Sequence, residues 1–364
     1  MAETSDLLVF KAGKTALAHI REKGLQPSDI RAVLGASGAA KWLAIYGLDR
    51  MIFSRWLNSA EKEIYILGTS IGAWKMSAAA QADPARAFDR LKEAYIHQRY
   101  RGRVTPEQIT TESLKILDIL LPPEKIREIL TNPRFRLGFA AVRCRGVMAA
   151  ENKAAQIAGM SAAFMMNLAS RSTQSLFFRR TLFHAPGFHA PGSGHWPLDM
   201  NDFPTTRVVL DRENFKYALL ASGSIPVIMD GIADIPAAPK GMYRDGGILD
   251  YHPVFPLDQG REGLILYPHF YPEITPGWFD KKISGRRAKG SLVDRTILVA
   301  PSPAFVAGLP WGRIPDRKDF TRFHGNDDER FRVWQTAAER SLELGNLFLE
   351  AVENGRIRDI VRPF

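Results

Sequence analysis

Residues 63–73 read EIYILGTSIGA and contain the strongest structural signal in the chain. The apolar, β-rich run at 64–67 predicts a strand that is buried on both faces. After Gly72 the composition changes to residues such as Ala and Met, which favour a helix. The five residues in between, Gly-Thr-Ser-Ile-Gly, therefore predict a sharp turn that holds Ser70 between a strand and a helix.

This predicted turn has the form of the nucleophile elbow of serine acyl hydrolases. Gly68 and Gly72 lack a Cβ atom, so a strand and a helix can approach each other closely at the turn. Ser70 would lie at the positive end of the helix, where an alkoxide or an adjacent oxyanion is favoured. We therefore predict that Ser70 is a nucleophile. A plain strand-to-helix turn is the alternative interpretation.

Length and composition indicate one globular α/β domain over residues 1–364. A chain of 364 residues with 45% hydrophobic and 24% charged residues can bury a full core. The single cysteine, Cys144, excludes an internal disulfide framework and a Cys-rich zinc site, and is expected to be a buried thiol in a reducing compartment. We find no secretory signal pattern and no apolar run of membrane-spanning length, so a cytoplasmic location is expected.

The net charge of +10 and the pI of about 9.7 predict attraction to anionic surfaces. No nucleic-acid-binding signature accompanies this charge, which favours anionic lipid over nucleic acid as the partner. The segment 270–289 combines aromatic and basic residues, namely Phe270, Tyr271, Trp278, Phe279, Lys281, Lys282, Arg286, Arg287 and Lys289. Such a segment suits transient docking on anionic headgroups, at about 1 kcal/mol per basic residue. A solvated loop is the equally weighted alternative.

A second strand, loop and helix precede the elbow. Residues 31–34 predict a strand, 37–42 read SGAAKW, and the apolar spacing from Leu43 to Ile52 is typical of a helix. The backbone amides of a small-residue loop can point at an anion. Beside the elbow, this loop would supply an oxyanion hole. A tight connection that only needs small residues is the alternative.

The remaining pattern completes an α/β chain. Helices are predicted at 14–23 and from Pro84 to about residue 95, and residues 105–136 are predicted to form two or three short helices with breaks at Pro122-Pro123 and Pro133. Strands are predicted at 135–142, 207–210 and 264–267. Residues 153–168 carry no charge after Lys153 and predict a largely buried helix, whose Met160, Met165 and Met166 fill the core or line an acyl-chain pocket. A C-terminal helix, within a helical extension at 325–364, is expected to pack on the sheet through Phe331, Trp334, Ala338, Leu342, Gly345 and Leu349.

Residues 184–197, HAPGFHAPGSGHWP, cannot form regular structure because of their proline and glycine content. Three histidines, His184, His189 and His195, suggest a metal site at first sight. No carboxylate and no helical spacing organises them, so we predict no metal there. A mobile lid loop over the site is the preferred interpretation.

Three motifs together resemble the patatin-like phospholipases: GTSIGAW at 68–74, ALLASGSIPVIMDGI at 218–232 and YRDGGILDYHPV at 243–254. The resemblance runs over about residues 31–257. It implies a three-layer α/β/α sandwich with a mostly parallel central sheet, and a Ser-Asp dyad instead of a Ser-His-Asp triad. Ser70 matches the nucleophile and Asp245 the dyad aspartate, followed by Gly246 and Gly247. The resemblance also implies hydrolysis of acyl esters of lipids with no metal and no organic cofactor.

The oxyanion loop of that family normally reads Gly-Gly-Gly-x-Arg/Lys-Gly. Here residues 37–42 keep only the central Gly38 and the basic Lys41. Because the donors are backbone amides, Gly38 and Ala39 are still expected to supply them. A carboxylate is a poor base near neutral pH unless burial raises its pKa, so a partly dry pocket is expected around Asp245.

The sequence thus predicts a lipid acyl hydrolase of the phospholipase A, lysophospholipase or esterase type that forms a covalent acyl-enzyme. Two alternatives stay open. One is a Ser-His-Asp esterase that uses His324, just before the last helix. The other is a non-catalytic lipid-binding or scaffolding protein on the same fold. The acyl donor, acyl transfer to an alcohol other than water, and the oligomeric state are not determined by these residues.

Overall fold

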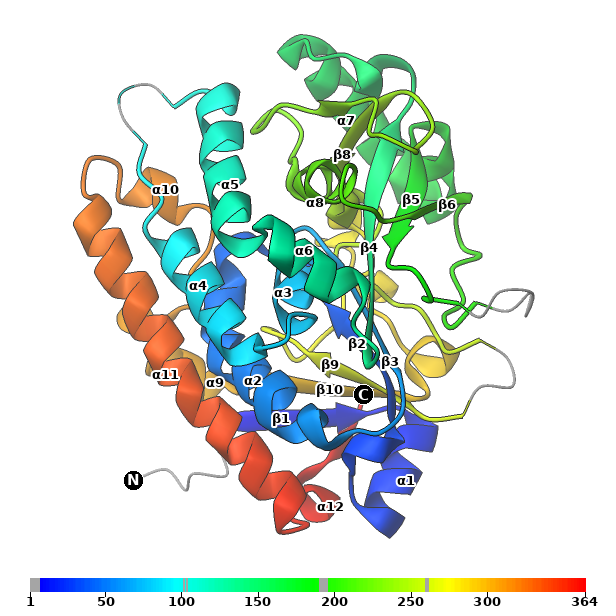
Figure 1. Ribbon diagram of the computed structural model, residues 1–364, viewed down its shortest axis with the longest axis vertical. Coiled ribbons are helices and arrows are strands. Elements are labelled where there is room, and N and C mark those ends of the chain that lie inside the picture. The colour runs from blue at the N-terminus through cyan, green and yellow to red at the C-terminus, as the bar shows by residue number, and fades with distance from the viewer. Residues whose placement is uncertain (1–6, 101, 103, 190–195, 259–261) are drawn as a thin grey trace.

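The computed structural model describes residues 7–100, 102, 104–189, 196–258 and 262–364. Within these residues an 11-stranded mixed sheet runs in the order β11-β1-β10-β9-β2-β3-β4-β5-β6, with β8 beside β4 and β7 beside β8 (Figure 1). The strands are β1 Leu8–Ala12, β2 Ile30–Gly35, β3 Ile64–Thr69, β4 Phe135–Cys144, β5 Phe178–His184, β6 Thr205–Val209, β7 Ile232–Ala233, β8 Met242–Asp245, β9 Leu264–Pro268, β10 Thr296–Pro301 and β11 Arg362–Pro363.

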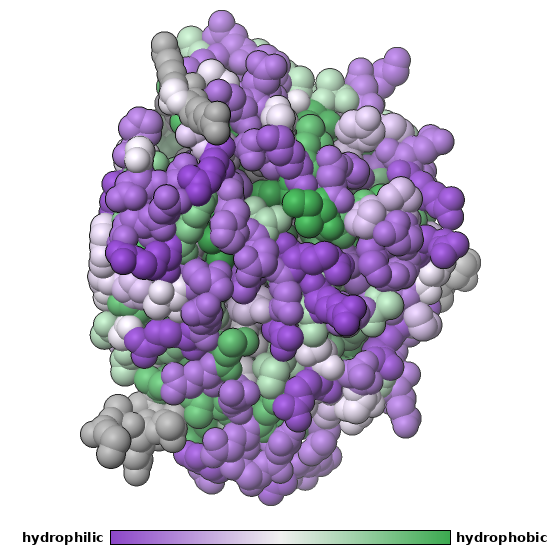
Figure 2. All heavy atoms as spheres, turned by 60° about the vertical axis from the view of Figure 1, so that its left-hand side comes forward, coloured by the Kyte–Doolittle hydropathy of each residue, from purple (hydrophilic) through white to green (hydrophobic). Residues whose placement is uncertain are grey.

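The helices agree with the predicted breaks at Gly24 and at Pro122-Pro123. They are α1 Lys14–Lys23, α2 Tyr46–Met51, α3 Ile71–Ala79, α4 Pro84–Ile96, α5 Pro106–Leu120, α6 Pro123–Leu130, α7 Lys153–Ala169, α8 Phe215–Gly223, α9 Pro303–Ala307, α10 Asp319–Arg322, α11 Asp327–Glu353 and α12 Ile357–Ile360. None of the described helices combines the length and the apolar character needed to cross a bilayer. Hydrophilic side chains prevail on the face shown in Figure 2, with hydrophobic ones between them.

The centre of the sheet is parallel, and its connections step in two directions. From β2 to β3 to β4 the chain moves one way across the sheet, whereas from β9 to β10 it moves the other way. Since parallel crossovers are right-handed, these connections lie on opposite faces. The helices α2, α3 and α4 therefore cover one face, and residues 269–295 cover the other. The predicted three-layer α/β/α arrangement with a mostly parallel sheet is confirmed.

The direction of the connections reverses between β2 and β9, which are neighbouring parallel strands. In open α/β sheets such a reversal leaves a crevice at the carboxyl ends of the strands, where ligands bind. The loop after β2 carries Gly38, the turn after β3 carries Ser70, and Phe270 follows β9. These three segments consequently meet at the carboxyl ends of the central strands.

Two hydrophobic cores support this end of the sheet. The larger core includes β3, in which all six residues are buried, as the apolar run predicted. A smaller core lies under α7 and contains Val142, Cys144, Met148, Ala163, Phe178, Phe203, Ile248, Leu249 and Phe279. Burial raises the pKa of the Cys144 thiol to about 12, so this cysteine is an unreactive core residue, as predicted.

One prediction about helices is wrong, and another holds only in part. The helix predicted to be largely buried, α7, exposes most of its large apolar side chains. The C-terminal helix, α11, packs mainly on α2 and on residues 39–45, and it packs on the sheet at β1. The reason is that α2 lies between α11 and most of the sheet, and a Cβ atom on Gly47 would lie 2.4 Å from the Leu342 backbone. Leu342, predicted to be buried, is 37% exposed.

Candidate active site

The turn at Ser70 has the strained backbone of a nucleophile elbow. Ser70 joins β3 to α3 with φ 54° and ψ −130°, a region that residues with a side chain rarely adopt. The two flanking glycines are required by space. A Cβ atom on Gly68 would lie 2.3 Å from the Gly72 carbonyl, and one on Gly72 would lie 2.2 Å from the Gly35 oxygen. The glycines thus allow β2, β3 and α3 to meet closely around Ser70.

Ser70 and Asp245 are 175 positions apart in the chain and meet at this turn. The Ser70 hydroxyl donates a hydrogen bond of 2.9 Å to Oδ2 of Asp245. Asp245 ends β8, which pairs antiparallel with β4 next to the elbow strand. The backbone N–H of Gly247 donates to the other carboxylate oxygen at 2.7 Å. One oxygen is therefore fixed by the backbone, while the other faces the serine.

The glycines after Asp245 allow this approach. A Cβ atom on Gly246 would lie 2.0 Å from the Ala140 carbonyl oxygen, and one on Gly247 would lie 2.4 Å from the Ser37 hydroxyl. The exposed fractions of Ser70 and Asp245 are 7% and 6%. The pair is therefore nearly dry, but it still touches the surface.

Burial makes Asp245 a stronger base than an exposed aspartate. Desolvation raises the pKa of its carboxyl to about 6, although hydrogen bonds from Gly247 and Ser70 and attraction to Lys281 and Arg317 oppose the rise. The carboxylate is therefore mostly ionised at neutral pH. A base needs this state to accept a proton.

The loop at 37–41 lies beside the dyad. The Ser37 amide donates to the Tyr251 carbonyl at 2.8 Å, and the Ser37 hydroxyl bonds to Oγ1 of Thr69 at 2.8 Å. Within the described residues, the amides of Gly38 and Ala39 donate to no protein acceptor. Ala39 has φ 50°, in the left-handed region. Two unpaired backbone donors are thus held in a loop that is fixed to the elbow strand at Thr69.

Two serines that hold the site in place, Ser222 and Ser224, were not predicted as functional residues. The Ser222 hydroxyl accepts the Ser70 amide at 3.0 Å and donates to the Ala140 carbonyl at 2.7 Å. The Ser224 carbonyl accepts the Asp245 amide at 3.0 Å. Both serines lie at the end of α8, in the Ala-Ser-Gly-Ser-Ile-Pro block at 221–226. That block was the sequence signal that could have identified these two serines. They connect Ser70 and Asp245 to one end of α8.

Basic residues surround the mouth of the site. The Lys281 ammonium lies 3.9 Å from the centre of the Tyr251 ring. Its pKa is lowered to about 7, first by desolvation of the ammonium and then by repulsion from Lys41 and Arg317. The residue as a whole is exposed. Lys281 and Arg317, from two separate segments, thus attract the Asp245 carboxylate.

No histidine bonds to the Ser70 or Asp245 side chain in the part of the chain that the structure describes. His324 lies in an exposed turn before α11, where its amide bonds to the Thr321 carbonyl. His252 is nearer in sequence to the dyad, but its Nδ1 accepts the Thr275 amide at 2.8 Å, and burial lowers its pKa well below the usual value. The serine–aspartate contact is therefore direct.

The predicted lid loop at 184–197 includes residues 190–195, which lie outside the described residues. Of its described ends, His184 closes β5 and Phe188 packs against Tyr65 with ring centres 5.4 Å apart. Tyr65 lies near the start of β3, whereas Ser70 follows its end. The described ends therefore lie away from Ser70, and a lid role for this loop stays a prediction.

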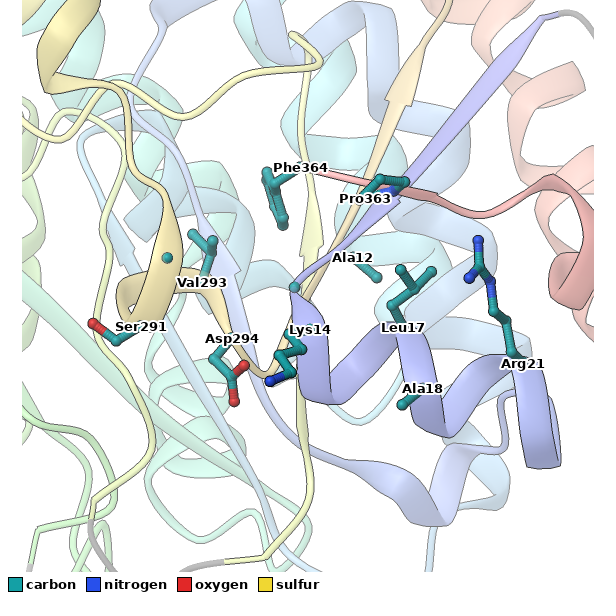
Figure 3. Close-up of a pocket in the computed structure, with 12 residues that line it drawn as sticks. Ala12, Lys14, Leu17, Ala18, Arg21, Ser291, Val293, Asp294, Pro363 and Phe364 are labelled. Carbon is teal, nitrogen blue, oxygen red and sulfur yellow. The ribbon is translucent and has the colours of Figure 1, made fainter.

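The pocket drawn in Figure 3 does not include the dyad. A pocket of about 790 Å³ lies between α1, the turn at 290–294 and the C-terminal residues (Figure 3). In it, Asp294 accepts hydrogen bonds from the Thr15 hydroxyl and amide, and so caps α1. Neither this pocket nor a smaller one at Asn167 and Asp280 includes Ser70 or Asp245. The Ser70–Asp245 pair marks the candidate site, because the volume of a pocket alone identifies no chemistry.

No protein-family profile and no curated protein sequence matches the chain. Among solved structures, human GIVD cytosolic phospholipase A2 is similar over 94% of this chain and 63% of that one, with 11% identity and a TM-score of 0.35. VipD from Legionella pneumophila is similar over 72% of this chain and 53% of that one, with 11% identity and a TM-score of 0.29. The chain thus spans less than two thirds of either neighbour.

Proposed function

We propose that the chain is a serine acyl hydrolase that cleaves acyl esters of lipids through a Ser70–Asp245 dyad, as patatin-like phospholipases do. The observation that carries the proposal is the 2.9 Å hydrogen bond from the Ser70 hydroxyl to Asp245 across a strained elbow. The three motifs that resemble the patatin-like family, in the same order, support it.

In the first half of the reaction, Asp245 accepts the Ser70 proton while the serine oxygen attacks the ester carbonyl. A serine hydroxyl needs a base within about 2.6–3.2 Å, and the observed contact lies in that range. The negative charge that develops on the carbonyl oxygen is stabilised by the unpaired amides of Gly38 and Ala39 and by the N-terminal end of α3. The alkoxide of the substrate then leaves with the proton from Asp245, and Ser70 stays acylated.

In the second half, Asp245 accepts a proton from water, and the resulting hydroxide attacks the acyl-enzyme. The same two amides stabilise the second tetrahedral intermediate. Ser70 regains its proton from Asp245 as the fatty acid leaves. Because Gly247 holds Oδ1 of the carboxylate, Oδ2 stays directed at Ser70 in both halves.

The test compares Ser70→Ala with Ser77→Ala. Both serines are buried, but the Ser77 hydroxyl only bonds to the Ala73 carbonyl one turn below in α3. We expect Ser70→Ala to lose nearly all hydrolysis of short acyl esters and all labelling by a fluorophosphonate, and Ser77→Ala to keep both. A panel of phospholipid, lysophospholipid, neutral acylglycerol and thioester donors then identifies the substrate. Full esterase activity in Ser70→Ala would contradict the proposal.

Two further outcomes separate the alternatives. Labelling and hydrolysis that disappear in His324→Ala would favour a triad, whereas the dyad predicts little change because His324 is exposed in a separate turn. Absence of labelling in the unaltered protein, with lipid binding intact, would favour a non-catalytic lipid-binding protein.

A further inference from the structure

The helix α7 presents its apolar side to solvent. Its buried residues are small or polar, namely Gln156, Gly159, Ala163 and Asn167. Its exposed side carries Ile157, Phe164, Met165, Met166 and Leu168, with exposed fractions from 38% for Phe164 and Met166 to 63% for Met165. A surface helix of a globular protein normally has the reverse orientation. We call these five exposed residues the α7 face.

Specific contacts fix this orientation. Gln156 accepts the Val227 amide at 2.7 Å and donates to the Glu151 carbonyl at 3.1 Å. Asn167 donates to Asp280 at 2.8 Å. Rotating the helix to bury its apolar side would break these hydrogen bonds inside the protein, which is costly. The α7 face is therefore set outward by the fold itself.

A basic segment adjoins the α7 face at the C-terminal end of the helix. The Arg286 guanidinium donates to the Leu168 carbonyl at 3.2 Å, and the Phe279 ring lies 6.4 Å from that of Phe164. The exposed Lys281, Lys282 and Lys289 form no ion pair within the described residues. We call residues 281–289 the basic segment.

We propose that the α7 face and the basic segment together dock the protein on an anionic lipid surface, with the apolar side chains entering the acyl boundary and the lysines meeting the headgroups. An exposed apolar helix face beside lysine and arginine is the usual composition of interfacial helices. A second copy of the chain fits less well. Each copy carries a net charge of +10, so two copies repel one another, whereas an anionic surface attracts the chain.

The docking surface is continuous with the candidate active site. Lys281 lies over the Tyr251 ring, and the Tyr251 carbonyl accepts the amide of Ser37 in the loop beside the dyad. Ile248 and Leu249, just after the dyad turn, belong to the same small core as Ala163 of α7. A surface bound at α7 would therefore lie near the mouth of the site. Binding itself does not require catalysis, so it can be tested separately.

The test measures co-sedimentation with vesicles of phosphatidylcholine alone and of phosphatidylcholine mixed with phosphatidylserine. It uses Ser70→Ala protein, so that hydrolysis cannot change the vesicles. We expect Met165→Glu to weaken binding to the mixed vesicles roughly tenfold or more, because the variant loses the free energy gained when the Met165 side chain is transferred from water into the lipid. The matched control is Leu342→Glu, an exposed apolar position on α11, which should bind as the parent does.

The charged part is tested with Lys282→Glu/Lys289→Glu. This variant should lose the preference for phosphatidylserine vesicles and the steep dependence of binding on salt. Circular dichroism and thermal melting verify that each variant is folded. Unchanged binding by Met165→Glu would overturn the proposal. So would light scattering that shows a dimer of the parent protein that Met165→Glu converts to a monomer, because the face would then be a self-association surface.

Discussion

The pKa of Asp245 makes the proposed reaction sensitive to pH. Because the carboxylate must be ionised to accept a proton and its pKa is about 6, kcat/KM for a neutral soluble ester should rise with pH, reach half its maximum near pH 6 and level off at higher pH. Lys281 lowers this pKa by attraction, so Lys281→Met should move the rise to higher pH. A pH–rate profile of both proteins measures the shift.

The control for this shift is Lys62→Met. Lys62 is exposed before the amino end of β3, whereas Ser70 lies after the carboxyl end. The profile of this variant should match that of the parent. If Lys281→Met also left the profile unchanged, then either Asp245 is not the base or Lys281 does not act on it.

Two neighbouring substitutions in the loop beside the dyad should differ in their effect on activity. A Cβ atom on Gly38 would lie 2.6 Å from the Phe270 ring, so Gly38→Ala should displace the amide donors and lower kcat about a hundredfold or more. Ala39→Gly should keep activity, because the φ of 50° suits glycine better than alanine. Steady-state kinetics on a short acyl ester compares them. Equal activity in the two variants would show that these amides are not the oxyanion donors.

At the scale of single residues, the sequence predicted that Ser70 and Asp245 meet in partly dry surroundings, but not that Lys281 acts on Asp245. Elbows and Asp-Gly-Gly turns depend on local glycine chemistry, which a sequence displays directly. Lys281 reaches the Asp245 region only because the β9–β10 connection folds over the opposite face of the sheet. No spacing along the chain encodes that contact.

At the scale of elements, a buried ion pair joins the elbow helix to its neighbour. The Lys75 ammonium in α3 lies 2.9 Å from both carboxylate oxygens of Asp49 in α2, and both side chains are almost fully buried. Burial raises the pKa of Asp49 to about 6 despite this attraction. Lys75→Met should reduce the free energy of unfolding by about 3–5 kcal/mol, because it leaves a buried carboxylate unpaired. Urea denaturation measures the loss.

A double variant and a variant of an exposed ion pair are the controls for this experiment. Asp49→Leu/Lys75→Met should recover most of the lost stability, since neither side chain then carries a buried charge. Lys115→Met, which breaks a pair with Glu112 in which Lys115 is 63% exposed, should change stability by less than about 1 kcal/mol. A double variant as unstable as Lys75→Met would mean that packing, not charge, dominates at this position.

The wrong prediction for α7 has a physical cause. The absence of charge after Lys153 suggested burial, but Gln156, Gly159, Ala163 and Asn167 recur at helical spacing and form the side that faces the protein. Small and polar residues suit the inner side here because Asp280 and the Val227 amide offer hydrogen-bond partners. Mean hydropathy cannot distinguish a helix buried in a core from one that faces an apolar surface outside the protein.

At the scale of the whole molecule, the sequence predicted the fold class better than the pairing of strands. Local patterns marked β2, β3 and β4, which are connected in order and adjacent in the sheet. The strand β1 was not predicted, and it pairs antiparallel with β10 at the far end of the chain. Propensity gives little information about such distant partners, because cross-strand neighbours decide the stability of a strand.

The pairing of β2 with β9 also has a consequence for how the protein folds while it is being translated. A ribosome completes β2 and the elbow early, but β9 and the partner of β1 emerge only after most of the chain has been made. Contacts between such distant segments form slowly because closing long loops costs entropy. A nascent chain would therefore carry Ser70 through the synthesis of the 175 further residues that end with Asp245, and under the proposed mechanism it would stay inert towards lipids over that interval.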